Sequence, residues 1–420
     1  MNHPKMMYTY VGLDSHKESH TAVFLDCFFE KLGEVTFKNL PSHFDDFLKE
    51  AEGLKRNDTE FLFGLEDVSA YGRTLTTFLV EHDQKVKHVN ALLVARERNN
   101  QNIIEKTDSI DAECAARVLL SKLDTLPDAK PQDEYIILRS LVVRRKFIVR
   151  NITALKNHLY CQITTHYPNY QDFFKNIDCN SSLAFLERYP SPESLKYTTI
   201  EELTAVIHEP SKGRVGARKA AEILDHVERN GFRPLAFQDM QDMAVQSTIR
   251  QLRFHMEELE TVEISLAQFL SRFECTLTSM VGIDIVTAAG ILSCIGDIKK
   301  FRTPAKLARY SGIAPVTHAS GKKDLQFANQ RGNKELHHLF HEVAHRLSMT
   351  VGSTNKVLNP FFFDYYQRKL SEGKTKRQAL KCLERRLVNI VWTMLTYNEE
   401  YVNPPMYDLP KKKEIKKNHA

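Results

Sequence analysis

The sequence predicts an α/β domain at the N-terminus, then long helices, and then a mainly helical C-terminal part. Up to about residue 130, short runs of β-branched and aromatic residues alternate with helical patterns. Apolar residues then recur at steps of three and four residues along two long stretches, 138–164 and 240–273. From residue 277, Gly282 ends one apolar segment and an Ala/Gly-rich helix follows.

The N-terminal elements can be placed in order. Residues 8–26 read as two strands joined by the polar turn "SHKESH". The run "EFLFGLED" at 60–67 and the segment 83–90 read as further strands, and a helix begins near residue 108. The Pro- and Asp-rich stretch 124–134 marks a domain boundary. We therefore expect an α/β domain over residues 1–130.

The rest of the chain is expected to be helical. The two long amphipathic helices of region 131–273 predict an antiparallel pair or a dimeric coiled coil. In region 274–400, the glycine turn at Gly282 predicts a helix–hairpin–helix-like element, whose turn amides often face a phosphate. Residues 360–397 should be helical with a break around Gly373, and a basic tail follows over 401–420.

Composition excludes several classes of protein. The chain has 420 residues, of which 42% are hydrophobic, and no apolar run approaches the roughly 20 residues of a membrane-spanning helix. The first residues lack the layout of a secretory signal. Seven scattered cysteines without a CxxC pair indicate neither a disulfide framework nor a zinc site. We expect a protein of a reducing cytoplasm that does not enter a membrane.

Positive charge is concentrated although the formal net charge is only +5. Residues 299–346 hold ten Lys/Arg against three Asp/Glu, residues 138–160 hold six against none, and the tail "KKKEIKKN" holds five against one. One such patch is as well explained by a solvated helix face. Three together favour a polyanionic partner, most simply nucleic acid.

Asp108 and Asp111 in "KTDSIDAE" allow two interpretations. Acidic residues in a first helical turn interact favourably with the free amides and the helix dipole. Alternatively, residues at i and i+3 share a helix face, and two carboxylates held there suit a hard divalent cation such as Mg²⁺. The residues of this stretch do not decide between the two.

Two further carboxylates favour the metal interpretation. Asp14 ends the first strand in "YVGLDSHK", and Glu66 ends the run "EFLFGLED". Strand ends are where α/β domains place their sites. Asp14, Glu66, Asp108 and Asp111 could therefore gather around two cations, the arrangement used for phosphodiester chemistry.

These stretches carry a resemblance to a known family. "VGLDSHK", "GLEDVSAYG" and "KTDSIDAE" resemble the RNase H-like, RuvC-type catalytic domain of the DEDD insertion-sequence transposases. The block beginning "MVGIDIVTAAGILSCIGDIKKF" is similar to the second transposase domain of the same family, and "NPFFFDYYQRKLSEGKTKRQALKCLERRLVNIVW" to its closing helical segment. The resemblance implies a transposase or recombinase whose four acids bind Mg²⁺, and whose partners are DNA, an element-encoded guide RNA and further copies of the chain in a dimer or tetramer.

The resemblance also implies a serine nucleophile in the second domain. The matching position is Ser320 in "VTHASGKKD", where basic residues follow the serine. Without the resemblance, a Ser-Gly pair reads as a turn. Ser311 is the nearby competitor and is expected to pack or cap a helix, and Asp67 could replace Glu66 as a ligand.

The expected nucleic-acid contacts come from the basic patches. His337, His338, His341 and His345 fall at helical spacings that can bind zinc, but without a third ligand nearby they favour a basic, phosphate-facing surface. The basic side chains expected to contact nucleic acid are Arg144, Arg145, Lys146, Arg150, Lys322, Lys323, Arg331 and Lys334.

Taken together, the sequence predicts an insertion-sequence DNA transposase or site-specific recombinase. A RuvC-like junction nuclease would use the carboxylates but dispense with Ser320. A catalytically silent nucleic-acid-binding regulator would tolerate loss of Asp14 or Ser320. A sugar-kinase-like or actin-like ATPase would need a second Gly-rich phosphate loop, which the sequence lacks.

Overall fold

The structure is a computed structural model that describes residues 3–66, 70–131, 133–231, 233, 236–320, 323–351 and 356–403. For residues 318–320, 323–325 and 351 it describes the backbone alone. The chain divides into two compact units, Met1–Ile136 and Ile137–Ala420. Each unit is described separately below.

The first unit contains a five-stranded sheet of order β3-β2-β1-β4-β5. β1 pairs antiparallel with β2 and parallel with β4, while β3 and β5 form the two edges. The strands expected near residues 8–26, 60–67 and 83–90 are all present. The bounds are β1 (Tyr8–Ser15), β2 (Ser19–Leu25), β3 (Lys31–Lys38), β4 (Glu60–Leu65) and β5 (Lys85–His88).

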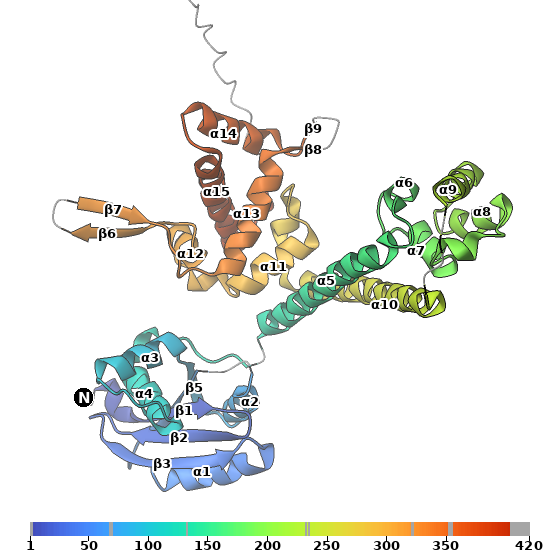
Figure 1. The fold of residues 1–420 in the computed structure, drawn as a ribbon. Helices are drawn as coiled ribbons and strands as arrows, with labels where there is room; N and C mark the ends of the chain where they lie inside the picture. The colour runs from blue at the N-terminus through green and yellow to red at the C-terminus, as the bar shows by residue number, and fades with distance from the viewer. Residues whose placement is uncertain are drawn as a thin grey trace, which may run out of the picture. The chain divides into compact units, whose positions relative to one another are not determined.

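Helices cover both faces of this sheet, as Figure 1 shows for the blue and cyan part of the chain. On one face, Phe44 and Leu75 pack against Val11 of β1 in one buried cluster. On the other face, Tyr10 of β1 belongs to a second cluster with Ala116. The alternation along β1 therefore buries both faces. The helices are α1 (Phe44–Glu52) and α2 (Arg73–Glu81) on the first face, and α3 (Ala91–Asn100) and α4 (Asp108–Ser121) on the second.

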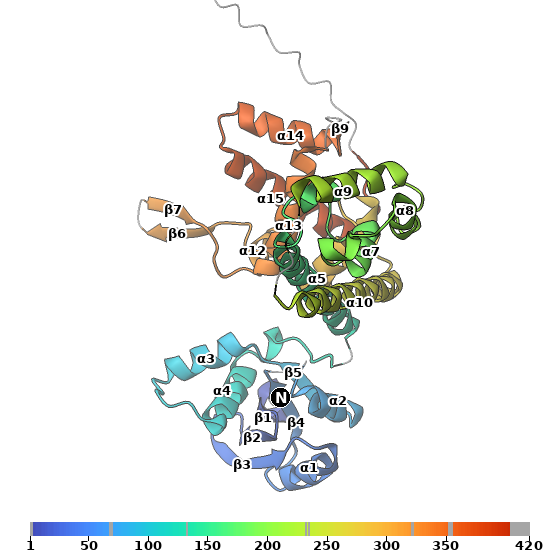
Figure 2. The same cartoon turned by 45° about the vertical axis from the view of Figure 1, so that its right-hand side comes forward.

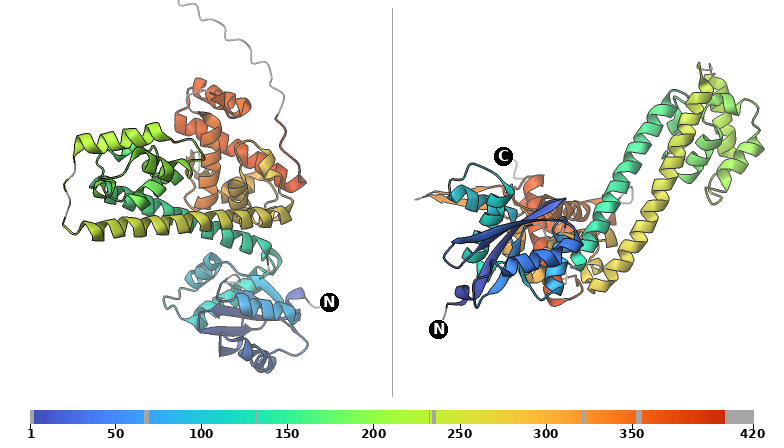
Figure 3. Two further views of the ribbon diagram at one scale, coloured as in Figure 1. Left: turned by 90° about the vertical axis from the view of Figure 1, so that its right-hand side faces the viewer. Right: turned by 90° about the horizontal axis from the view of Figure 1, so that it is seen from below.

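Two long helices, α5 (Glu134–Thr164) and α10 (Gln238–Leu270), run side by side in opposite directions (Figure 3). Leu159 of α5 and Ile249 of α10 share one buried cluster, and Arg145 of α5 pairs with Glu263 of α10. The expected antiparallel pair is thus formed within one chain. Their far ends enclose a small helical bundle of α6 (Tyr170–Phe173), α7 (Asn180–Arg188), α8 (Ile200–His208) and α9 (Ala217–Asn230).

The C-terminal part of the second unit is mainly helical, as expected. The helical prediction for 360–397 is confirmed, and the break is at Gly373, which has φ +85°. A two-stranded hairpin extends from this part (Figure 2). The elements are α11 (Ile285–Ile295), α12 (Pro304–Tyr310), β6 (Val316–Ser320), β7 (Lys323–Phe327), α13 (Lys334–Ser348), β8 (Thr350–Val351), β9 (Lys356–Val357), α14 (Pro360–Ser371) and α15 (Lys376–Tyr397).

The turn at Gly282 differs from the expected helix–hairpin–helix. Gly282 does adopt a positive φ of +97°, but the segment before it, Thr276–Ser279, is a single 3-10 turn rather than a helix. One amide of the first turn of α11 is also capped, because the carboxylate of Asp284 accepts a hydrogen bond from the Thr287 N–H at 2.7 Å. The expectation of a helix before this turn is therefore wrong, while a phosphate facing the turn amides stays a prediction.

Within the described residues, no helix is long and apolar enough to cross a membrane.

Candidate active site

Parallel pairing of β1 and β4 brings the first two predicted carboxylates to one edge of the sheet. Leu13 of β1 is in register with Leu65 of β4, so Asp14 and Glu66 are the next residues along two adjacent parallel strands. The strand ends expected from the sequence therefore lie side by side. Asp67, the alternative ligand, lies outside the described residues.

A glycine in β1 lets α4 approach this edge. A Cβ atom placed on Gly12 would come within 2.0 Å of the Ala112 carbonyl oxygen and 2.4 Å of the Ala116 nitrogen. Only glycine leaves room for such a close backbone approach. The contact sets the first turn of α4, which carries Asp108 and Asp111, against the end of β1.

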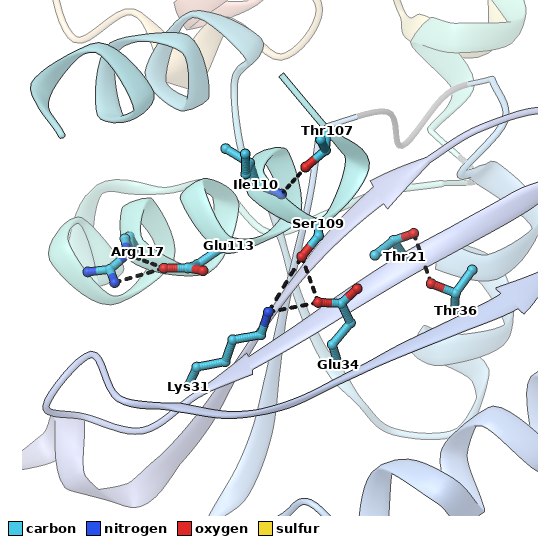
Figure 4. Close-up of polar contacts among 9 residues, drawn as sticks. All are labelled: Thr21, Lys31, Glu34, Thr36, Thr107, Ser109, Ile110, Glu113 and Arg117. Carbon is cyan, nitrogen blue, oxygen red and sulfur yellow. Dashed lines mark hydrogen bonds and ion pairs between the residues drawn. The ribbon is translucent and has the colours of Figure 1, made fainter. Parts of the chain in front are cut away.

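Two side-chain interactions fix the start of α4 (Figure 4). The hydroxyl of Thr107 accepts a hydrogen bond from the Ile110 N–H at 3.2 Å and caps the helix. The Ser109 hydroxyl donates to Glu34 of β3 at 2.6 Å, and Lys31 donates to the same carboxylate at 2.7 Å. The hydrogen bond from Lys31, with that from Ser109, lowers the pKa of Glu34 and keeps its carboxylate charged. Asp108 and Asp111 thus lie in the first turn of a capped helix, as the first interpretation of this stretch expects.

All four predicted carboxylates line one open cavity of about 580 Å³. Its remaining walls come from the ends of β1 and β5, the start of α3 and the segment before α4. The lining residues are Asp14, Ser15, His16, Glu66, Tyr71, His88, Asn90, Ala91, Lys106, Asp108 and Asp111.

His16 links two of these carboxylates. Its Nε2 lies 3.2 Å from Asp14 Oδ2 and 3.1 Å from Asp108 Oδ1. Burial opposes protonation of His16, but the charges of Asp14 and Asp108 outweigh it and raise the pKa of the imidazole. His16 is not among the site residues that the sequence predicts, because it falls in the polar turn "SHKESH". The available signal was its position two residues after Asp14, directly beyond the end of β1.

Asp111 is held by two cationic side chains. Arg98 of α3 forms a short ion pair with Asp111 Oδ1, and Lys106 Nζ lies 3.9 Å from Asp111 Oδ2. Asp111 and Arg98 are mostly buried, with side chains 15% and 19% exposed. Arg98 was also missed, since nothing in "VARERNN" distinguishes it from a surface arginine.

The donor set fits a divalent cation. One ligand atom from each of Asp14, His16 and Asp108 lies within 4.8 Å of the other two. Burial, followed by the nearby charges of Asp108 and Asp111, raises the pKa of Asp14 despite the opposing effect of His16. Carboxylates that destabilise one another's charge in this way are relieved by a hard cation, for which oxygen ligands are preferred.

Ser320 lies at the tip of the β6–β7 hairpin. It is in register with Lys323, so Gly321 and Lys322 connect the two strands. The side chains of Ser320 and Lys323, and the whole of Lys322, lie outside the described residues. The hairpin itself was not anticipated, although a Gly-containing pair between alternating residues is typical of such turns. Ser311 packs as expected, fully buried with its hydroxyl donating to the Ala308 carbonyl at 3.2 Å.

The basic stretch of α5 finds acidic partners on other helices. Arg144 lies 3.4 Å from Glu258 and Arg145 2.7 Å from Glu263, both on α10. Lys146 pairs with Glu335 of α13. With the pair between Lys156 and Asp178 at 2.7 Å, four of the six basic residues of this stretch are neutralised without a polyanion. By contrast, Arg150 is exposed and makes no ion pair within the described part of the chain.

The remaining predicted contact residues lie near the start of α13. Arg331 and Lys334 are both exposed. Further along the helix, His341 Nδ1 lies 2.9 Å and His337 Nε2 3.5 Å from the buried carboxylate of Glu384 in α15. Two of the four histidines thus serve an internal polar cluster.

Comparison with known protein families matches both halves of the chain. A family model of DEDD transposases of the IS110 type, described as a transposase, matches residues 11–168. A second model, described as the transposase IS116/IS110/IS902 family, matches residues 275–359. The first match spans the whole carboxylate cavity, and the second spans the β6–β7 hairpin.

Individual relatives agree with these models. The chain is 25% identical over 400 residues, 92% of its length and 94% of the other protein, to the insertion element IS116 uncharacterized 44.8 kDa protein of Streptomyces clavuligerus. It is 27% identical over 295 residues, 69% and 70% of the two chains, to the insertion element IS110 uncharacterized 43.6 kDa protein of Streptomyces coelicolor. It is also 27% identical over 130 residues, 30% and 37% of the two chains, to the pilin gene-inverting protein of Moraxella bovis.

Proposed function

Because this chain belongs to the IS110-type DEDD transposases of insertion sequences, we propose that it cuts and rejoins DNA strands with a carboxylate site and a serine nucleophile. Members of such a family are DNA transposases, so DNA is the partner and a divalent metal ion is required. We propose Mg²⁺ as the ion and a RuvC-type fold for residues 1–130. We also propose that residues 1–130 and 274–400 form two catalytic domains, and that a coiled-coil or linker region separates them in the sequence.

The observation that supports the proposal most strongly is the shared cavity. Asp14, Glu66, Asp108 and Asp111 come from three separate stretches of sequence, yet all of them line it. Arg98 and Lys106 offset the charge of Asp111, and His16 bridges two of the other carboxylates. Burial and the charges of Asp108 and Asp111 nevertheless raise the pKa of Asp14, which a bound cation would counteract. We propose that they hold the divalent ions, which would activate an attacking oxygen and stabilise charge on a leaving oxygen.

Other residues of the cavity would prepare it for a phosphodiester. Arg98 and Lys106 fix the carboxylate of Asp111, and Lys106 is largely exposed at the rim, where its ammonium group can contact a phosphate oxygen. His16 holds the carboxylates of Asp14 and Asp108 in place.

Ser320 is proposed as the nucleophile of strand transfer. Its Oγ would form an ester bond to phosphorus while the bond from phosphorus to the leaving oxygen breaks, and the hydroxyl proton ends on the released strand. A hydroxyl on the incoming strand would reverse this step and regenerate the serine. Lys322, Lys323 and Arg331 follow in sequence and would stabilise charge on the phosphate.

The proposal includes further partners. An element-encoded guide RNA would pair with donor and target DNA, and the active form would be a dimer or tetramer. Of the basic residues expected to bind nucleic acid, Arg150, Arg331 and Lys334 remain the strongest, since all three are exposed. Arg144, Arg145 and Lys146 would have to exchange a protein carboxylate for a phosphate.

Strand exchange in Mg²⁺, with element-end DNA and candidate flanking RNA, tests the proposal. Asp14→Ala should abolish cleavage, and Ser320→Ala should abolish strand transfer. Normal recombination by Ser320→Ala would refute the serine assignment. Cleavage without rejoining by Ser320→Ala would favour a junction nuclease, and full activity of both variants would leave only a nucleic-acid-binding regulator.

Mixing the two inactive variants tests whether residues of different subunits act together in the oligomer. If the carboxylates of one subunit act with Ser320 of another, a mixture of Asp14→Ala and Ser320→Ala proteins should regain part of the activity. A mixture as inactive as each component would contradict action across subunits.

A further inference from the structure

A second cavity lies among α13, α14 and α15 of the C-terminal part, which pack together in Figure 1. Its volume is about 700 Å³, within the range of about 300–1,000 Å³ typical of ligand sites. None of the described residues that line it is acidic. The lining residues are His341, His345, Ser348, Met349, Thr350, Phe363, Tyr366, Gln367, Leu370, Lys376, Arg377 and Leu380.

One wall of this cavity is aromatic and apolar. Phe363 and Tyr366 lie one turn apart on α14 and are only partly buried. Met349, Leu370 and Leu380 continue the apolar surface. Partly exposed aromatic rings of this kind provide platforms on which an unpaired base stacks, whatever its identity.

Two cationic side chains and two imidazoles also line this cavity. Lys376 and Arg377, the first residues of α15, are exposed and make no ion pair within the described part of the chain. His341 and His345 lie one turn apart on α13, with ring centroids 6.4 Å apart. The hydrogen bond between His341 Nδ1 and Glu384 fixes the orientation of the first ring. These groups suit the phosphate oxygens of a nucleotide.

The surroundings of these cationic side chains are also positively charged. Residues 365–386 contain eight Lys/Arg and two Asp/Glu. Both acids are already engaged, because Glu372 pairs with Lys369 at 2.8 Å and the buried Glu384 pairs with Lys381 at 2.8 Å. Neither Lys376 nor Arg377 pairs with a carboxylate within the described residues, although Asp364 of α14 directly precedes this stretch.

We propose that this cavity binds a nucleotide of single-stranded nucleic acid, with the base against Tyr366 and Phe363 and the phosphate at Lys376 and Arg377. This inference rests on the proposed function, because it names where such a protein would hold an unpaired strand. It concerns binding alone and involves none of the four carboxylates or Ser320. RNA and DNA share the chemistry that the cavity recognises, so the experiment must distinguish them.

Binding of the full-length protein to fluorescein-labelled oligonucleotides of about 12 nucleotides tests the inference. RNA, single-stranded DNA and duplex DNA of one sequence are compared by fluorescence anisotropy in EDTA, where no cleavage takes place. The double variant Lys376→Gln/Arg377→Gln should bind the single strand about tenfold more weakly. The slope of log Kd against log salt concentration should also decrease by roughly 0.7, because both side chains are assigned to one phosphate and about 0.7 is lost for each single-strand phosphate contact.

A second variant tests stacking separately from charge. Tyr366→Leu keeps an apolar side chain on α14 but removes the ring, and should weaken single-strand binding roughly fivefold without changing the salt dependence. Oligonucleotides that carry 4-thiouridine or 4-thiothymidine should crosslink, on irradiation, to peptides that contain Phe363 or Tyr366. The control is Lys175→Gln/Arg214→Gln, which removes two exposed charges elsewhere in the same unit and should bind as wild type.

The outcomes are separable from those of the transposase proposal. Weakened binding of RNA alone, or of single-stranded DNA alone, supports the site and shows which of the two nucleic acids it binds. Equal weakening of duplex DNA overturns the single-strand assignment. Wild-type affinity in both cavity variants overturns the site itself, whether or not Asp14→Ala abolishes cleavage.

Discussion

Gly12 of β1 lies against Ala112 of α4 so closely that a Cβ atom on the glycine would come within 2.0 Å of the alanine carbonyl oxygen. The clash would be with helix backbone, which cannot rotate away as a side chain can. This contact sets the distance between Asp14 on the strand and the aspartates of the first helical turn. The geometry of the carboxylate site thus depends on a residue without a side chain.

Gly12→Ala should therefore displace α4 and destabilise the first unit by about 3 kcal/mol, at the upper end of overpacking effects. Hydrogen–deuterium exchange should increase in peptides from α4, and cleavage activity should fall with it. Gly53→Ala is the matched control, because φ is −68° there and alanine adopts it readily. Equal exchange in the two variants would show that the Gly12 contact does not hold α4.

Thr107→Ala should remove the cap at the start of α4. Loss of the hydrogen bond to the Ile110 N–H should cost about 1 kcal/mol and raise exchange in the first turn, next to Asp108 and Asp111. Thr107→Ser keeps the hydroxyl and should preserve both stability and activity. If the serine variant loses as much as the alanine variant, the hydroxyl is not what fixes this turn.

Arg145 and Arg150 of α5 should behave differently on neutralisation. Arg145 pairs with Glu263, so Arg145→Gln should lower thermal stability and leave polynucleotide affinity nearly unchanged. Arg150 is exposed and unpaired within the described residues, so Arg150→Gln should weaken affinity with little effect on stability. Melting temperature and anisotropy, measured on both variants, give the comparison. Equal loss of affinity in the two would restore Arg145 as a nucleic-acid contact.

His337 should make the C-terminal part less stable in acid. Burial and the ammonium group of Lys381, against the effect of Glu384 and with a smaller contribution from His341, lower the pKa of His337. The unfolded chain therefore takes up a proton as the pH falls through about 6.5, while the folded protein resists it. The free energy of unfolding should decrease as the pH falls from 7.5 to 5.5.

Urea unfolding followed by Trp392, the single tryptophan of the chain, measures this effect. His337→Gln should lose less stability between pH 7.5 and 5.5 than the wild type does. His158→Gln, at an exposed position of α5, is the control for loss of a histidine. An unchanged pH dependence in His337→Gln would assign the acid sensitivity to other groups.

Site residues could be predicted from the sequence where the apolar pattern marks the end of a strand and the sheet topology brings strand ends together. Asp14 and Glu66 could be found because apolar runs end at them, and parallel pairing then brings strand ends together. β3 was not anticipated because it is an edge strand with much of its surface exposed, so its apolar alternation is weak. The partners of Asp111 were also missed, since Arg98 reaches it only through the packing of α3 beside α4.

Charge patterns along the sequence were less reliable than apolar patterns. The stretch from Arg144 to Lys146 has no acid near it on α5, whose one acidic residue is Glu134 in the first turn. Its neutralising carboxylates are more than 100 residues away on α10 and α13. A helix read alone cannot reveal a partner supplied by tertiary packing.

Divalent-ion binding to the intact protein tests the central claim most directly. Mn²⁺ titration followed by electron paramagnetic resonance, without DNA, compares the wild type with Asp14→Asn and Asp108→Asn, and with Glu50→Gln as a charge-matched control on the exposed face of α1. We expect the wild type and Glu50→Gln to bind Mn²⁺ with the same affinity, Mg²⁺ to compete, and both aspartate variants to bind at least tenfold more weakly. Equal binding by all four proteins, or none by the wild type, would contradict a metal site built from these carboxylates.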